Sequence, residues 1–164
     1  MKSTDHLQGA RFNTTTGLTL VADIGGPESG QPVILLHGGG QTRHSWSKAA
    51  LELAAAGYRV ISLDLRGHGE SQWCPKGRYA LDDHIADLGT VMESLHSASV
   101  LVGASLGGVV SLVGQGEQRL PRARALVLVD VVPRMEADGI QEIINFMSAN
   151  PDGFASVDAA AEAV

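Results

Sequence analysis

The sequence predicts an α/β protein with a doubly wound, mainly parallel sheet. Short apolar runs alternate along the chain with stretches of helical periodicity. Two of the runs, Val33–Leu36 and Ser99–Val102, lack polar alternation, as strands buried on both faces do. Because strands that alternate with helices are joined by right-handed crossovers, most of these strands should lie parallel in one sheet.

The chain begins with a predicted β-hairpin and continues into a first buried strand. Residues 8–24 combine two strand-like runs with a turn at Thr14–Gly17, and we expect this hairpin at a sheet edge. A loop of turn-forming residues then leads into Val33–Leu36. Apolar residues at helical spacing follow from Trp46 to Ala54, and Gly57 is a natural end for that helix.

The middle of the chain alternates strand and helix. Residues 58–63 predict a third strand, which runs into the polar, glycine-punctuated loop Asp64–Ser71. Apolar positions then recur at intervals of three and four residues, which predicts an amphipathic helix. These positions are Leu81, His84, Ile85, Leu88, Val91, Met92 and Leu95. The buried run Ser99–Val102 comes next, and residues 123–129 predict a further strand.

One serine lies where strand character turns into helix character. Gly103-Ala104-Ser105-Leu106-Gly107 has the pattern Gly-x-Ser-x-Gly, and apolar residues at helical spacing follow it. A tight strand-to-helix turn forces its apex residue into sparsely populated backbone space, and the two glycines remove side-chain clashes there. The N–H groups at the start of the helix would face any negative charge that develops at the turn. Ser105 is therefore the candidate nucleophile.

Behind the last predicted strand the character of the chain changes. Residues 140–147 carry a helical apolar stripe behind Asp138, which we expect to be the N-cap. Another helix should start near Ser156, and no Gly, Pro or basic residue ends it. We therefore expect residues 1–132 to form the N-terminal part of a core domain, and residues 133–164 to be the start of a helical segment that is cut short.

Composition and charge narrow the classes of function. The 164 residues are 44% hydrophobic and 18% charged, which is ordinary for a folded domain. The net charge of −6 and the lack of basic runs argue against a nucleic-acid or membrane surface. The sequence shows neither an apolar leader nor a membrane-length run, so we expect a cytoplasmic location. Cys74 is the only cysteine, which excludes an intrachain disulfide and a cysteine metal cluster.

Three loops at strand ends together resemble the α/β-hydrolase fold family. They are His37-Gly38-Gly39-Gly40, Asp64–Ser71 and the turn at Ser105, and they occur in the family's order. The similarity covers roughly Phe12 to Val132. Residues 133–164 look like the first part of the lid found in epoxide-hydrolase-like and esterase-like members. The resemblance implies neither a metal nor a cofactor.

The resemblance also assigns roles to residues of these loops. It implies that Ser105 is the nucleophile and that the backbone N–H groups of Gly39 and Leu106 form the oxyanion hole. Related epoxide hydrolases and dehalogenases carry Asp at the turn, whereas Ser implies acyl transfer. Three neighbouring loop residues are candidates for contact with the substrate: His37, Gly38 and Gly40.

The sequence departs from the family pattern at the catalytic base and acid. A serine nucleophile needs a base, but all six histidines precede Ser105, and the family's histidine follows a later strand. His37 is nearest to the turn, with ordering of the glycine loop as its alternative role. Asp130 ends the last predicted strand, where a minority of relatives carry the acid, and its alternative role is a hydrogen bond within its loop.

Three interpretations stay open on the sequence alone. The first is the N-terminal part of a serine hydrolase that acts by acyl transfer on a small, mostly apolar ester or related substrate. The second is a non-catalytic protein of the same fold that binds a small ligand or a partner, and the third is a half-enzyme completed by another chain. We also expect homo-oligomers through residues 125–129, because this predicted edge strand contains no charge and no proline.

Overall fold

The computed structural model describes residues 6–131 and 137–163 and divides the chain into two compact units, Met1–Val131 and Val132–Val164. Each unit is described by itself. The strands are β1 (Gln8–Asn13), β2 (Thr19–Gly25), β3 (Pro32–Leu36), β4 (Arg59–Leu63), β5 (Val100–Ala104) and β6 (Ala125–Val129). The helices of the first unit are η1 (Arg43–Trp46), α1 (Ser47–Ala55), α2 (Leu81–Glu93) and α3 (Leu106–Gly116).

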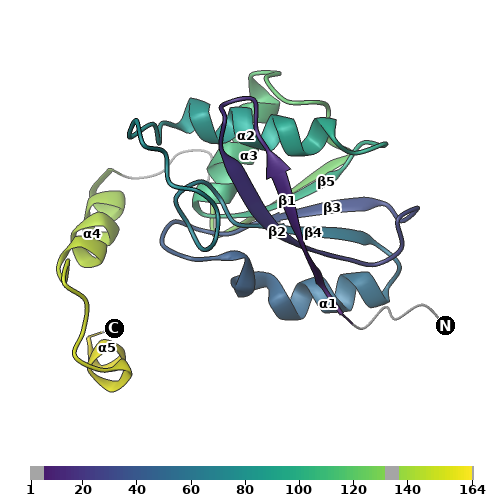
Figure 1. The fold of residues 1–164 in the computed structure, drawn as a ribbon. Helices are drawn as coiled ribbons and strands as arrows, with labels where there is room; N and C mark the ends of the chain where they lie inside the picture. Colours follow the sequence, from purple (N-terminus) through teal and green to yellow (C-terminus); the bar gives the residue numbers. More distant parts are fainter. Residues whose placement is uncertain (1–5, 132–136, 164) are drawn as a thin grey trace. The chain divides into compact units, whose positions relative to one another are not determined.

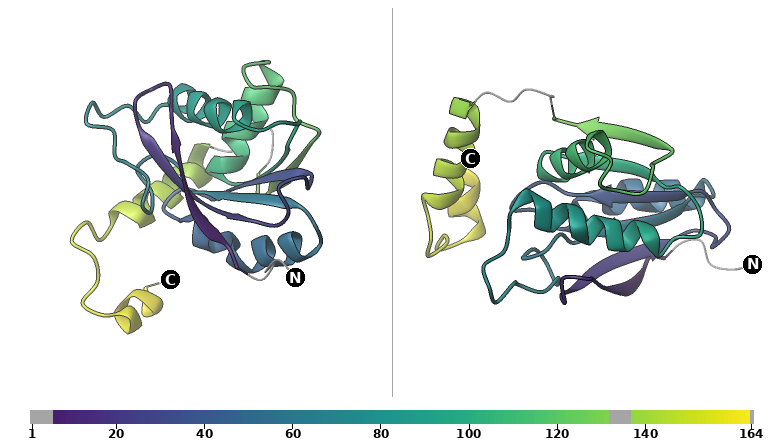
Figure 2. Two further views of the ribbon diagram at one scale, coloured as in Figure 1. Left: turned by 45° about the vertical axis from the view of Figure 1, so that its right-hand side comes forward. Right: turned by 90° about the horizontal axis from the view of Figure 1, so that it is seen from above.

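The six strands form one open sheet in the order β1-β2-β4-β3-β5-β6 (Figure 1). The hairpin of β1 and β2 lies at one edge as expected and pairs antiparallel with β4, while β4, β3, β5 and β6 are parallel. Helix α1 covers one face, and α2 and α3 cover the other (Figure 2). The α/β fold class with a mainly parallel sheet is therefore confirmed.

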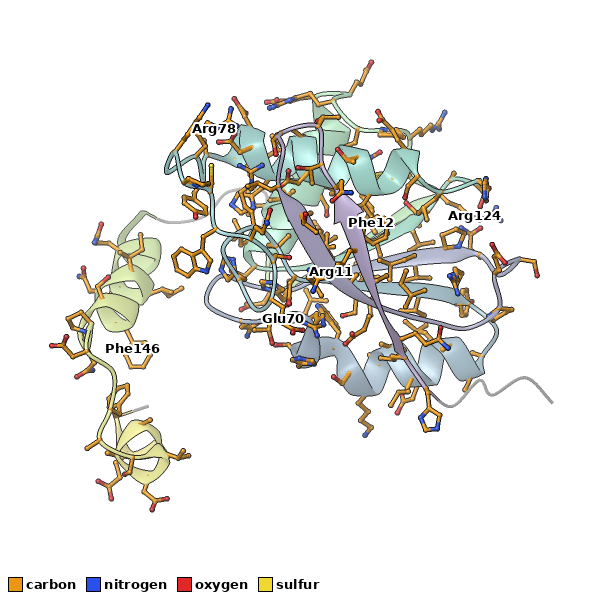
Figure 3. The ribbon with its side chains drawn as sticks, in the orientation of Figure 1. Arg11, Phe12, Glu70, Arg78, Arg124 and Phe146 are labelled. Atoms are coloured by element: carbon orange, nitrogen blue, oxygen red, sulfur yellow. The ribbon has the colours of Figure 1, made fainter. Side chains whose placement is uncertain are left out.

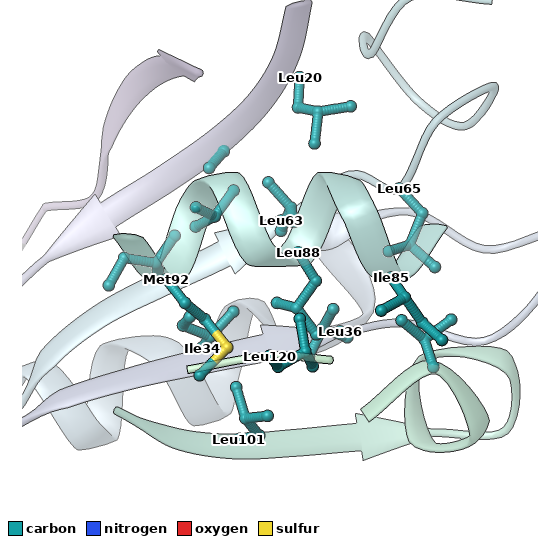
Figure 4. Packing of buried hydrophobic residues seen from close by; sticks show 14 residues of the cluster. Leu20, Ile34, Leu36, Leu63, Leu65, Ile85, Leu88, Met92, Leu101 and Leu120 are labelled. Carbon is teal, nitrogen blue, oxygen red and sulfur yellow. The ribbon is translucent and has the colours of Figure 1, made fainter. Parts of the chain in front are cut away.

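Alternation along β3 divides the core into two layers. Val33 and Leu35 pack in the cluster that α1 contributes to, whereas Ile34 and Leu36 pack in the larger cluster with α2 (Figure 4). All five residues of β3 are buried, which explains why this strand shows no polar alternation in sequence. Burial of each large aliphatic side chain contributes about 1.5–3 kcal/mol to the free energy of folding. Strand β3 therefore stabilises both layers of the core.

The register of the parallel strands brings three loops to one edge of the sheet. Leu36 at the end of β3 pairs with Leu63 of β4 on one side and with Gly103 of β5 on the other. The chain therefore leaves all three strands at nearly the same level. The predicted loops that begin at His37 and Asp64, and the turn at Ser105, are neighbours for this reason.

Strand β6 is the far edge of the sheet in the described part of the chain. Its side chains alternate between exposed and half-buried, and Val127 and Val129 are 45% and 41% exposed. The edge position expected from the sequence is present.

The second unit contains α4 (Ala137–Ser148) and α5 (Val157–Glu162). Asp138 lies inside α4, so it is not the N-cap that the sequence predicts. A carboxylate in the first turn still favours a helix N-terminus, which accounts for the sequence signal. Ser156 caps α5 as expected, since its Oγ accepts the N–H of Ala159 at 3.1 Å. Across the described residues, none of the helices combines the length and apolarity needed to cross a membrane.

Candidate active site

Ser105 occupies the turn between β5 and α3 with a backbone that few side chains adopt. Its φ and ψ are 43° and −114°, a strained combination that costs about 1–3 kcal/mol. The Ser105 N–H donates to the carbonyl of Val129 at 3.1 Å, and its carbonyl accepts the N–H of Val109 at 2.9 Å. The turn is thus held from β6 and from α3, and the strand-turn-helix context expected for Ser105 is present.

The glycines on either side of Ser105 are sterically required. A Cβ on Gly103 would lie 2.5 Å from the backbone of Gly107, and a Cβ on Gly107 would lie 2.6 Å from the Cβ of Leu36. In both cases the added Cβ would meet a backbone atom or a Cβ atom of a close-packed turn. Such atoms cannot move aside as the end of a flexible side chain could. The spacing of the Gly-x-Ser-x-Gly pattern therefore follows directly from the packing.

The glycines after β3 form a four-residue turn beside the nucleophile candidate. The N–H of Gln41 donates to the carbonyl of Gly38 at 3.2 Å, which closes the turn. Gly40 has a φ of 72°, which the third position of a type II turn requires and which favours glycine. A Cβ on Gly38 would lie 3.3 Å from the Cβ of Ser105, so the turn approaches the serine closely.

The N–H groups of this turn have different partners. Gly38 N–H donates to Gln41 Oε1 at 3.1 Å, and Gly40 N–H donates to His68 Nε2 at 3.1 Å. Within residues 6–131 and 137–163, the N–H groups of Gly39 and Leu106 donate to no protein acceptor. These are the two groups that the sequence analysis assigned to an oxyanion hole.

His37 is buried beneath the turn, and both of its ring nitrogens are engaged. Nε2 accepts the N–H of Leu65 at 3.0 Å, so the ring hydrogen is on Nδ1, which donates to the carbonyl of Gly38 at 2.7 Å. Burial lowers the pKa of His37, which keeps the ring neutral. The geometry gives His37 the loop-ordering role, and neither nitrogen is open to Ser105 or to a substrate.

His68 supports the same turn from the loop after β4. Its ring packs against that of His37 with 5.0 Å between the centroids. Since Nε2 accepts the N–H of Gly40, the hydrogen on Nδ1 donates to the carbonyl of Arg66 at 2.9 Å. The sequence analysis counted His68 only among the six histidines and missed this role. A histidine between two glycines in a loop at a strand end was the available signal.

Asp64 is the centre of a buried ionic network that fixes the loop after β4. Its carboxylate accepts the backbone N–H of Arg43 at 2.6 Å, the Arg43 guanidinium at 2.5 Å and the N–H of Glu70 at 3.0 Å. Burial would lower the pKa of Arg43, but its hydrogen bonds with Asp64 and Glu70 and its ion pair with Asp23 outweigh burial and raise it. Glu70 is at the exposed end of the network (Figure 3).

Asp130 follows β6 directly, next to the residue whose carbonyl holds Ser105. It is exposed and has a φ of 53°, a left-handed conformation that Asp tolerates better than most residues. Its carboxylate makes no hydrogen bond within the described part of the chain. The assignment of Asp130 as an acid therefore stays a prediction.

Comparison with known proteins agrees with this geometry. The family model described as "alpha/beta hydrolase fold" matches residues 31–164. The chain belongs to the α/β-hydrolase fold family. The matched residues include the glycine turn, the Asp64–Ser71 loop and the Ser105 turn, so the resemblance seen in the sequence is confirmed.

The relatives of this α/β-hydrolase chain include enzymes that are named for different reactions. Bovine protein phosphatase methylesterase 1 is 30% identical over 138 residues, which cover 81% of this chain and 36% of the methylesterase. Non-heme chloroperoxidase from Streptomyces lividans is 32% identical over 143 residues, which cover 85% of this chain and 48% of that enzyme. The chain thus spans less than half the length of these relatives.

The structure is also similar to a solved α/β-hydrolase from Novosphingobium aromaticivorans. The TM-score is 0.75 at 26% identity, and the match covers 84% of this chain and 49% of that protein. The six strands and the turns that follow β3, β4 and β5 therefore belong to a known hydrolase architecture.

Proposed function

We propose that this chain supplies the nucleophile and the oxyanion hole of a serine hydrolase. Ser105 Oγ would give its proton to a base and attack the carbonyl carbon of a small, mostly apolar ester or related substrate. The bond to the leaving group then breaks, that group departs with the proton, and water hydrolyses the acyl-enzyme to release the acid and Ser105. The N–H groups of Gly39 and Leu106 would stabilise the negative charge on the carbonyl oxygen. The observation that carries the proposal is the strained Ser105 turn beside the glycine turn: among the described residues, the N–H of Gly39 in that turn and the N–H of Leu106 at the start of α3 have no protein acceptor.

Serine at the turn supports acyl transfer over the alkyl-ester chemistry of an aspartate nucleophile. The methylesterase among the relatives is named for ester cleavage, which is consistent with this choice. The net charge of the chain is negative and its sequence has no basic runs, and both features favour an uncharged substrate.

The proposal needs a base that His37 and His68 do not provide. Both rings are engaged within the loops, and His84 lies on α2. We propose that the base is a histidine from outside residues 1–164, on a longer form of this protein or on another chain. Asp130 is the candidate acid that would orient it. Without the base, the rate should be lower by several orders of magnitude.

A fluorophosphonate, which modifies nucleophilic serines, tests the nucleophile in the 164-residue chain. We expect slow but selective modification of Ser105, faster with added imidazole, which supplies an external base. Peptide mass mapping gives the site. Ser105→Ala should abolish the modification, and Ser29→Ala is the matched control, because Ser29 is exposed on the β2–β3 loop and unrelated to the turn. Equal labelling of wild type and Ser105→Ala would favour the non-catalytic binding protein.

Two substitutions at Gly39 test the oxyanion hole. Gly39→Ala keeps the N–H and adds a Cβ that meets no atom within 4 Å, so labelling should be nearly unchanged. Gly39→Pro removes the N–H, and loss of one such donor typically costs about 10²–10³-fold in rate. If Gly39→Pro reacts as fast as Gly39→Ala, the Gly39 N–H does not serve the oxyanion.

A further inference from the structure

Side chains take up the N–H groups on either side of Gly39. Gln41 holds Gly38 twice, because its backbone N–H donates to the Gly38 carbonyl at 3.2 Å and its Oε1 accepts the Gly38 N–H at 3.1 Å. On the other side, His68 Nε2 accepts the Gly40 N–H at 3.1 Å. Gly39 lies between these two fixed neighbours, and its own N–H has no acceptor among the described residues.

We propose that Gln41 is a positioning residue for the oxyanion hole, which holds Gly38 so that the N–H of Gly39 faces the reacting carbonyl above Ser105. This inference rests on the proposed acyl-transfer function. Gln41 touches neither Ser105 nor the oxyanion in this assignment. It acts through the backbone of the glycine turn.

The need for such a residue follows from the sequence of the turn. Three consecutive glycines have the largest backbone freedom of any tripeptide, so the peptide between Gly38 and Gly39 could rotate away from the nucleophile. A hydrogen bond on the Gly38 N–H and another on its carbonyl fix the orientation of the peptide units that flank that residue. Gln41 supplies the bond on the N–H and shares the carbonyl with His37, whose Nδ1 also donates to it at 2.7 Å.

The position of Gln41 also explains why an amide suits this site. A Cβ on Gly38 would lie 3.2 Å from Gln41 Oε1 and 3.3 Å from the Cβ of Ser105, so the carboxamide lies near the nucleophile. The amide oxygen accepts the Gly38 N–H without a net charge. A carboxylate at the same place would accept the same bond but would repel the developing oxyanion.

Amide hydrogen exchange, measured by NMR on the 164-residue chain, tests the hydrogen bond. In Gln41→Met, which keeps the length and removes the acceptor, we expect the Gly38 amide to exchange about tenfold faster. Gln41→Glu should keep the protection of Gly38. The matched control is Gln115→Met, because Gln115 Oε1 accepts the N–H of Ala123 at 3.0 Å near the far end of α3, about 15 Å from Ser105 along the helix.

Phosphonylation of Ser105 in imidazole buffer gives the second readout. We expect Gln41→Met and Gln41→Glu to react about 10–100-fold slower than wild type, as small displacements of catalytic groups do, and Gln115→Met to react normally. Unchanged exchange of Gly38 in Gln41→Met, or normal labelling despite faster exchange, would overturn the proposal. If wild-type Ser105 is not labelled at all, the acyl-transfer function fails and the positioning role fails with it, whatever the Gly38 amide does.

Discussion

Gly69 combines a φ of 52° with direct contact to a buried carboxylate. A Cβ at this position would lie 2.1 Å from Oδ2 of Asp64, whose carboxylate is held by Arg43 and cannot move away. We expect Gly69→Ala to lower the free energy of unfolding by more than about 2 kcal/mol, from backbone strain and from the clash. Gly77→Ala is the control, because Gly77 has a φ of 64° but open space around its Cβ position.

Chemical denaturation of the two variants separates the two costs. Gly77→Ala should show only the backbone strain, about 1–2 kcal/mol. Equal destabilisation by the two substitutions would mean that the Asp64 carboxylate is not fixed where the network places it.

His84 makes stability depend on pH. Burial, followed by the nearby Arg66 guanidinium, lowers the pKa of His84 to about 4. As the pH falls from about 6.5 towards 4, the unfolded chain therefore takes up a proton that the folded protein does not, and stability decreases by up to about 3 kcal/mol. Above pH 6.5 this contribution to stability is fully present.

Denaturation at pH 7 and pH 4.5 measures this effect. His84→Leu removes the titrating group together with a buried Nδ1 that has no hydrogen-bond partner in the described structure. Between the two pH values, the free energy of unfolding should fall by about 2–3 kcal/mol less in the variant than in wild type. The same loss in both proteins would assign the acid sensitivity to other groups.

At the scale of elements, Arg66 connects the loop after β4 to α2 and to the β1–β2 turn. Its guanidinium is fully buried and donates to both carboxylate oxygens of Asp87 at 2.7 Å, and to Thr16 Oγ1 at 3.2 Å. Burial would lower the pKa of Arg66, but the bonds to Asp87 raise it. The three elements are thus joined by one side chain.

Arg66→Met should destabilise the protein by about 3–5 kcal/mol, since it leaves the Asp87 carboxylate buried without its partner. The double variant Arg66→Met, Asp87→Leu should recover most of this loss, because the buried charge is gone. Urea denaturation of both variants and of Asp87→Leu completes the cycle. A double variant as unstable as the sum of the single variants would show that the pair is not coupled.

Apolar patterning predicted most elements within one or two residues, because β3 is buried at every position and α2 is buried with a period of 3.6. The roles of Gln41 and His68 could not be predicted in this way. Each depends on which backbone N–H lies opposite a side chain once the turn after β3 has formed and, for His68, once the loop after β4 has packed beside it. The His68 contact joins two loops, the Gln41 contact lies within one irregular turn, and neither leaves a periodic signal in the sequence.

For the whole molecule, the free edge of β6 suggests self-association. Val127 and Val129 are exposed on a strand with no charge between Ala125 and Val129, and the outer edge offers unpaired backbone groups. We propose that two copies of the chain pair through β6, and we expect dimers or larger species in size-exclusion chromatography with light scattering.

Val127→Lys should shift the chain towards monomer, because a lysine disfavours strand pairing at an edge. Leu51→Lys is the control, since Leu51 is 39% exposed on α1, away from the sheet edge. A wild-type chain that stays monomeric at all concentrations would contradict the pairing.

The position of β3 between β4 and β5 also determines when the site can form during synthesis. Val33 pairs with Val60 on one side but with Val100 on the other. At about 5–20 residues per second, translation from the end of β4 to the end of β5 takes roughly 2–8 s. During that interval the nascent chain lacks β5, so one edge of β3 has no partner strand. The glycine turn at Gly38 also has no serine beside it. The nascent chain therefore has no Ser105 turn until α3 has been made, and until then the exposed apolar strand β3 can bind chaperones.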